Sequence, residues 1–313
     1  MSTSFSPITN GRDVSLLPFL NKTTERTVMK KNYSFALMTV FIWATGATLL
    51  KFLFNDIPNF EALSISSVFS FLFLLISNII RGNMHLLKEY FPTNIGKLLV
   101  LNFGGLFLYN ALYYKGISIL TAQEACILNY LWPVMLVLFS CIILKERLSA
   151  VKLLSILCAF AGVVILSLGK NASAGTDRAL GAVCCLAAAA CYALYCVYNK
   201  KLDLDQNITM MIGWGTVAVS AGIIGVLTED WVMITGKGWI GMLWMGLVVN
   251  AISYLCWALA INNSKDSARI ASMAYLTPFL SVIFSAIFLG ESITLNAVIA
   301  LVVIIGGVLV SQL

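Results

Sequence analysis

Apolar runs separated by short polar connections cover the chain from Tyr33 onward. Ten of these runs approach the roughly 20 residues that an α-helix needs to cross a bilayer. We therefore predict ten membrane-spanning helices, at residues 33–53, 60–80, 96–115, 120–144, 150–169, 179–199, 208–227, 239–262, 267–289 and 293–312.

Residues 1–32 are polar, being made largely of Ser, Thr and Asn with scattered basic residues. They have neither the apolar segment nor the small-residue cleavage site of a signal peptide. We expect this segment to be a polar cytoplasmic tail. Because the later connections are short, no separate extramembrane domain is expected.

The composition supports a membrane protein. Hydrophobic residues make up 60% of the chain, charged residues only 11%, and the mean hydropathy is +0.91. Soluble domains average about 25% charged residues. The chain therefore has too little charge to cover a solvated surface, and we predict an all-α integral membrane protein.

Basic residues in the connections predict the orientation in the membrane. If the N-terminus is cytoplasmic, fifteen Lys and Arg residues lie on the cytoplasmic side and five on the outer side. Cytoplasmic connections normally carry the excess of Lys and Arg. Both termini are therefore predicted to be cytoplasmic.

The two halves of the chain resemble each other at an offset of 145 residues. Matched pairs include Tyr109 with Tyr254, Tyr130 with Tyr275, Pro133 with Pro278, and Glu146 with Glu291. Each half, residues 33–169 and 179–313, contains five apolar runs, so the two copies are predicted to have opposite orientations. Inverted repeats around a central cavity are typical of secondary transporters, although some channels have them too.

The repeated glutamate has different neighbours in the two halves. Glu146 lies between Lys145 and Arg147, whereas Glu291 lies between Gly290 and Ser292. Since the cations do not recur with it, we expect the glutamate to have a structural role.

A proline interrupts an apolar run in each half, in "NYLWP" and "YLTP". Pro133 and Pro278 lack an N–H, so the carbonyls of Asn129 and Ala274 lose their helical partners. Freed carbonyls are tolerated at membrane depth only where protein or water meets them, which favours a polar cavity. We therefore expect hinges at the two prolines; the alternative is a packing kink in which Asn129 bonds a neighbouring helix.

Aromatic and amide side chains recur near the middle of several runs, with Trp43 at a similar depth. Aromatic belts at the membrane interfaces explain Tyr33, Tyr198, Trp231 and Trp239 instead. A cavity of phenols, indoles and amides favours a flat, amphipathic or cationic solute through stacking and cation–π contacts. The candidate substrate-binding residues are Tyr109, Asn110, Tyr113, Asn129, Tyr130, Trp132, Tyr192, Tyr254, Trp257 and Tyr275.

Acidic residues are missing from the middle of every run. A central carboxylate is the usual device for proton exchange or multivalent-cation binding. Its absence argues against a proton-coupled multidrug antiporter and a divalent-metal carrier. The single histidine, His85, excludes a histidine-based metal site, and the eight cysteines lie in apolar runs as expected of small buried residues. We expect no metal and no cofactor.

Several residues near the ends of runs have two interpretations. Glu124 either reaches a cavity mouth or lies at a helix start, where the dipole favours a carboxylate. Lys51 and Lys200 end equivalent runs and are expected to extend toward the membrane interface. Small residues at 161–162 and 306–307 are expected to let helices approach closely.

The segments "EACILNYLWP", "YALYCVYNKK" and "AYLTPFLSVIFSAIFLGE" resemble EamA-type carriers of the drug/metabolite transporter superfamily. Within that superfamily they are most like YddG-type aromatic amino acid exporters. The resemblance covers residues 33–313 and implies ten helices around an aromatic-lined cavity in a bacterial cytoplasmic membrane. Carried onto matching positions, it implies cavity residues at Tyr109, Asn110, Tyr113, Tyr130, Trp132 and Tyr192. Tyr192 occupies a position of tryptophan type.

The sequence therefore predicts a membrane transporter that exports a small amphipathic metabolite, aromatic or apolar amino acids foremost, by alternating access. The alternative is a carrier of the same fold for a nucleoside, a cofactor or a cationic organic solute. A lipid-modifying enzyme or sensor would need catalytic acids or histidines near one interface, and the sequence shows none. The expected partners are the solute and the lipid bilayer, without nucleic acid.

Overall fold

The computed structural model describes residues 17–143, 145, 149–167, 176–202, 204–262 and 273–310. All regular structure in these ranges is helical. The elements are α1 (Leu17–Leu53), α2 (Asn59–Ile80), α3 (Met84–Tyr90), α4 (Ile95–Leu101), the π-helix η1 (Asn102–Phe107), α5 (Leu108–Ile119), α6 (Ala122–Asn129), α7 (Trp132–Ile143), α8 (Ala150–Ser167), α9 (Thr176–Leu202), α10 (Gln206–Thr228), α11 (Gly236–Leu243), the π-helix η2 (Trp244–Ile252), α12 (Ser253–Asn262), the short 3-10 helix η3 (Met273–Tyr275), α14 (Leu276–Leu289) and α15 (Leu295–Val310).

Helix occupies part of each of the ten predicted runs. In the described part of the chain, seven helical stretches are long and apolar enough to cross a membrane. Shorter apolar helices cover Ile156–Leu166, Met273–Leu289 and Leu295–Gly307. The prediction of a multi-pass, all-α membrane protein is confirmed. That all ten runs cross the bilayer stays a prediction.

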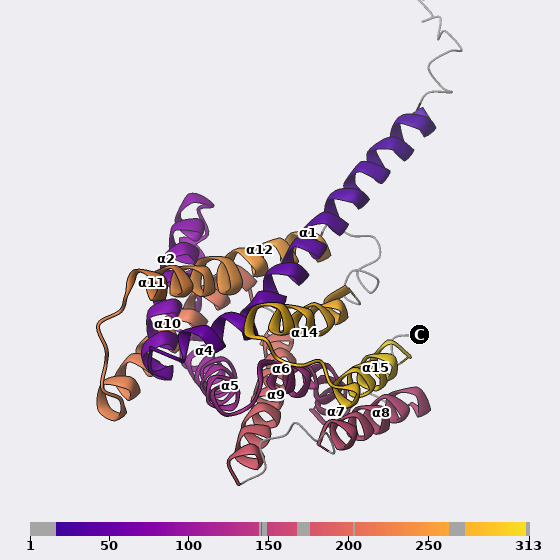
Figure 1. The fold of residues 1–313 in the computed structure, drawn as a ribbon. Coiled ribbons are helices and arrows are strands. Elements are labelled where there is room, and N and C mark those ends of the chain that lie inside the picture. The colour runs from indigo at the N-terminus through magenta and orange to yellow at the C-terminus, as the bar shows by residue number, and fades with distance from the viewer. Residues whose placement is uncertain are drawn as a thin grey trace, which may run out of the picture.

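Helix α1 begins within the segment predicted to be a tail. It starts at Leu17, whereas its apolar, membrane-spanning part covers Lys30–Leu53. In Figure 1 its first turns project beyond the other helices. The polar residues up to 32 are thus partly continuous with the first span. Residues 1–16 lie outside the described part of the chain.

The helices pair in a pattern that recurs between the two halves. Helix α2 packs against α10, and α8 packs against α15, which lies beside it in Figure 1. Helix α1 contacts both α12 and α14, and α9 correspondingly contacts both α5 and α7. The sequence offset relates α1 to α9, α5 to α12 and α7 to α14, so each of these pairings between the halves has a counterpart.

Small residues bring some helices close together, as expected for α8. A Cβ added to Gly162 would lie 3.0 Å from the carbonyl oxygen of Ala300 and would collide with the Ile304 side chain. The same expectation is wrong for Gly306, because a Cβ there would meet nothing within 4 Å. The face of α15 that touches α8 contains Ala300 and Ile304, while Gly306 is turned away from it.

Glu291 holds the start of a distant helix. Its carboxylate oxygens accept hydrogen bonds from the backbone N–H groups of Ala122 (2.6 Å) and Gln123 (3.1 Å) in the first turn of α6. Those N–H groups have no partner within their own helix, and the helix dipole favours an anion there. This contact accounts for the structural role expected of the glutamate. Its counterpart Glu146 lies outside the described residues.

A second glutamate secures the start of α2. The Glu229 carboxylate accepts hydrogen bonds from the backbone N–H groups of Phe60 (3.0 and 3.1 Å) and Glu61 (3.1 Å). Glu61 in turn accepts a 3.0 Å bond from the backbone N–H of Val232. The start of α2 is thereby tied to the connection that follows α10.

Candidate functional site

The helix that contains NYLWP is interrupted, as its proline predicts. Helix α6 ends at Asn129, Tyr130 and Leu131 form a turn, and α7 begins at Trp132. The interruption precedes the position expected from the sequence, because Pro133 is accommodated in the first turn of α7, where the missing N–H matters least.

The equivalent segment of the second half is shaped differently. The tight 3-10 turn of η3 (Met273–Tyr275) leads directly into α14 at Leu276. Thr277 and Pro278 both lie in the first turn of α14, so the break again precedes the proline. The two proline segments therefore share a position in the repeat while differing in local geometry.

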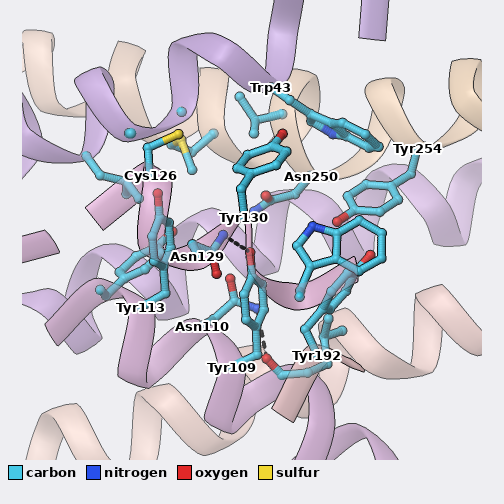
Figure 2. A pocket seen from close by; sticks show the side chains of 18 of the residues that line it. Trp43, Tyr109, Asn110, Tyr113, Cys126, Asn129, Tyr130, Tyr192, Asn250 and Tyr254 are labelled. Carbon is cyan, nitrogen blue, oxygen red and sulfur yellow. Dashed lines mark hydrogen bonds between the residues drawn. The ribbon is translucent and has the colours of Figure 1, made fainter. Parts of the chain in front are cut away.

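A cavity of about 120 Å³ lies beside these two interruptions. That volume is enough for several water molecules. Figure 2 shows aromatic and amide side chains converging on it from several helices. Of the ten residues predicted from the sequence, those that line it are Tyr109, Asn110, Tyr113, Asn129, Tyr130, Trp132, Tyr192 and Tyr254.

Trp257 and Tyr275 are not brought to the cavity wall. The Trp257 indole packs behind the wall on Trp43, with ring centroids 5.3 Å apart. On the tight turn of η3 the neighbouring Ala274 faces the cavity, while Tyr275 is buried. The sequence identifies both aromatics near the correct depth, but their direction depends on where each helical turn begins.

Aromatic rings form a continuous group along one side of the cavity. The centroid of the Tyr109 ring lies 6.1 Å from that of Tyr113 and 4.9 Å from that of Tyr192. The Trp132 indole meets the Tyr192 ring edge-on at 5.2 Å and 85°. Across the cavity, Trp43 lies 5.3 Å from Tyr254. Ring faces and edges are thus available to a flat solute.

Amides supply hydrogen-bonding groups between these rings. Asn129 donates from Nδ2 to the Tyr109 hydroxyl at 3.2 Å, drawn as a dashed line in Figure 2. Its Oδ1 and the Nδ2 of Asn250 are buried without a hydrogen-bond partner among the described residues. An unsatisfied buried polar atom costs about 1–3 kcal/mol. A ligand that supplies the missing partners would relieve this cost.

Asn250 and Trp214 line the cavity but were not among the predicted residues. Asn250 lies in η2, and the wider turn of that π-helix determines where its amide faces. Each is a polar or aromatic residue inside an apolar run, the signal that identified Asn129 and Trp132. The direction of Asn250 could not be read from the sequence, which gives no sign of the π-helix.

Glu124 has a partner that the sequence did not suggest. It lies in the first turn of α6, and one carboxylate oxygen is 2.8 Å from Nη2 of Arg178. Arg178 lies in the first turns of α9, so the pair joins the starts of two helices that line the cavity. Glu124 does not line the cavity. The aromatic wall therefore contains no carboxylate among the described residues.

A model of the EamA-like transporter family matches residues 30–168 and 179–312. The chain belongs to the EamA-like transporter family. The resemblance found in the sequence is thereby confirmed. Each half of this EamA-family chain matches the family model separately.

Similar proteins agree with this assignment. The "Aromatic amino acid exporter YddG" of Ancylobacter novellus is 28% identical over 214 residues, covering 67% of this chain and 74% of the relative. The "Uncharacterized transporter YvbV" of Bacillus subtilis is 26% identical over 272 residues, covering 85% and 86%. A crystal structure at 19% identity superposes with a TM-score of 0.65 over 90% of this chain and 96% of the other, which shows a shared fold.

Proposed function

We propose that this EamA-family chain exports aromatic or apolar amino acids, or a similar small amphipathic metabolite, by alternating access. The observation that carries the proposal is the ring group of Tyr109, Tyr192 and Trp132, which stands beside the unpartnered amide oxygen of Asn129. Together they offer an apolar surface and polar groups within one cavity.

A neutral amino acid has complementary chemistry. Its apolar side chain would stack on Tyr192 and Trp132, each aromatic contact contributing about 0.5–1.5 kcal/mol beyond buried area. Its ammonium would donate to the amide oxygen of Asn129, and its carboxylate would accept from the Asn250 amide. A zwitterion carries no net charge, so the site needs no charged residue to balance it. The exporter activity in the name of the Ancylobacter novellus relative supports the same substrate class.

We further propose that residues 33–169 and 179–313 are inverted five-helix repeats. The recurring pairings, α1 with α12 and α14 and α9 with α5 and α7, support a two-fold relation between the halves. In transporters of this kind the site lies near the bilayer midplane at the repeat interface. Movement at the interruptions before Pro133 and Pro278 would expose the cavity alternately to the two sides of a bacterial cytoplasmic membrane.

The test is uptake of labelled phenylalanine, tryptophan, threonine and methionine into proteoliposomes that contain the purified full-length chain. We expect saturable flux of at least one aromatic or apolar amino acid. Trp132→Ala should remove most of it, because the substitution deletes an edge of the ring group. Trp239→Ala is the matched control: Trp239 is 43% exposed and lies outside the cavity wall, so flux should be retained.

Thermal unfolding in detergent shows whether each variant is folded. Equal flux through the wild type and a folded Trp132→Ala variant would contradict the proposed site. If no amino acid moves and a nucleoside or organic cation does, the substrate class is wrong and the alternative carrier function replaces it.

A further inference from the structure

A second hollow lies on the outside of the helix bundle, between α9 and the segment formed by α4 and η1. Its volume is about 780 Å³, several times that of the central cavity. Val100, on its rim, is 75% exposed. We refer to this hollow, bounded by Gly96–Gly105 and Leu194–Leu202, as the α4–α9 groove.

Glycines, which have no side chain, create the groove. A Cβ added to Gly96 or Gly104 would meet nothing within 4 Å, so both glycines border open space. Gly105, by contrast, is packed against Tyr195, whose Cβ would lie 2.6 Å from an added Cβ. Tyr195 therefore forms the floor, and the two open glycines leave the trough above it. Leu101 and Leu194 keep its walls apolar.

Two lysines stand at one end of the groove. Lys97 is in the first turn of α4 and Lys201 in the last turn of α9, so both lie at the same end of the bundle. Both side chains are exposed, and neither has an acidic partner within the described part of the chain. Tyr198 is one turn before Lys201 and 42% exposed, which adds a phenol hydroxyl to the same end.

This arrangement matches the two parts of an anionic phospholipid. Because the chain crosses the membrane, an outward-facing apolar trough is surrounded by acyl chains, and its ends lie near the headgroups. Lysines at headgroup level attract anionic lipids, and tyrosines are enriched at the same depth. We propose that the α4–α9 groove binds one anionic phospholipid, with an acyl chain along the trough and the phosphate between Lys97 and Lys201.

A second groove between helices of the two halves provides an internal comparison. It lies between α1, α11 and α14, and its volume is about 330 Å³. Trp244, Phe284 and Phe288 contribute to its lining, and Lys237 is its one lysine. With less space and half the positive charge, this groove should not select an anionic lipid. Of these two grooves, only the α4–α9 groove therefore combines the space and the paired lysines that favour an anionic lipid.

Native mass spectrometry of the full-length chain tests the proposal. The probes are phosphatidylglycerol and phosphatidylcholine with identical acyl chains. We expect the wild type to retain one phosphatidylglycerol at least several-fold more strongly than phosphatidylcholine. Replacing both lysines, Lys97→Gln with Lys201→Gln, should abolish that preference. Lys115→Gln, at an exposed lysine of α5 outside the groove, should leave it unchanged.

The trough has its own test. Gly104→Leu should block retention of the lipid while both lysines remain, because the new side chain fills space that is open in the wild type. Gly96→Leu provides a second filling variant should the first fail to fold.

Three results would overturn the proposal. They are equal retention of the two lipids by the wild type, an unchanged preference in the double lysine variant, and unchanged retention in a folded filling variant. Displacement of the lipid by millimolar inorganic phosphate would likewise overturn it, since a free anion rather than a lipid would then fit the lysines.

Discussion

At the scale of single residues, the cavity depends most on Tyr192. Its ring contacts Tyr109 and Trp132 in the cavity wall, and it also stacks on Tyr195 at 6.2 Å and 21°. No other ring in the described part of the site has three aromatic neighbours of this kind. A substitution there should therefore affect binding more than one at a peripheral ring.

Replacing Tyr192 by Ala should raise the substrate concentration for half-maximal flux about tenfold or more. The stacking contact between the solute and the Tyr192 ring contributes about 0.5–1.5 kcal/mol beyond its buried area, and 1.4 kcal/mol corresponds to a factor of ten. Tyr192→Phe keeps the ring and should stay close to the wild-type value. Concentration-dependent proteoliposome flux measures both. A Phe variant as weak as the Ala variant would show that the hydroxyl, rather than the ring, binds the substrate.

The sequence identified most of the aromatic and amide residues that line the cavity, because such side chains stand out inside an apolar run. It could not separate Tyr254, which faces the cavity, from Trp257, which packs behind the wall on Trp43. Three residues along a helix keep a side chain on nearly the same face but move it about 4.5 Å along the axis. The sequence predicts the depth of an aromatic side chain in the membrane to within about one helical turn. A difference of one turn decides whether the ring lines the cavity or packs behind its wall.

At the scale of helical elements, α2 and η2 approach each other closely at a glycine. A Cβ added to Gly246 would collide with the carbonyl oxygen of Ser66 and lie 2.7 Å from the Cβ of Phe69. The Ser70 hydroxyl also donates to the Gly246 carbonyl at 3.0 Å. Neither backbone can yield without separating the two helices.

Gly246→Val should therefore lower the free energy of unfolding by about 1–3 kcal/mol or more, as overpacking of a dense core does. The thermal midpoint in detergent and the yield of monodisperse protein are the measurements. Gly236→Val is the matched control, because a Cβ at Gly236 meets nothing within 4 Å. Equal midpoints for the two variants would mean that α2 and η2 separate readily.

Helical runs were predictable from hydropathy, whereas their irregularities were not. Hydropathy does not distinguish an α-turn from the π-turns of Asn102–Phe107 and Trp244–Ile252. Pro133 predicted an interruption, but the turn at Tyr130–Leu131 was fixed by how the proline fits the start of α7. The partner of Glu291 was likewise hidden, since it lies 169 residues away in sequence.

At the scale of the whole molecule, orientation is the property that the repeat and the basic residues predict together. His85 follows α2 and is exposed, and exposed Asp230 follows α10. An even number of predicted spans precedes His85 and an odd number precedes Asp230. With a cytoplasmic N-terminus, the two connections lie on opposite sides of the membrane.

Cysteines introduced at these positions should label differently in intact cells. In a background whose eight cysteines are replaced, Asp230→Cys should react with a membrane-impermeant maleimide, and His85→Cys should react only after the membrane is opened. The reverse pattern would invert the orientation. Reaction of both in intact cells would contradict the assignment of spans.

The π-helices η1 and η2 immediately precede the helices that carry Tyr109 and Tyr254. A π-turn holds one residue more than an α-turn, so it acts as a local insertion in the helical phase. Removing one residue from η1 would therefore be absorbed by a return to α-geometry, with Tyr109 and Tyr113 kept at nearly the same angle. The same deletion in an ordinary α-turn of α5 would rotate every later side chain by about 100°. The π-helices are thus the positions at which family members can differ by one residue in length and still present the same wall to their solutes.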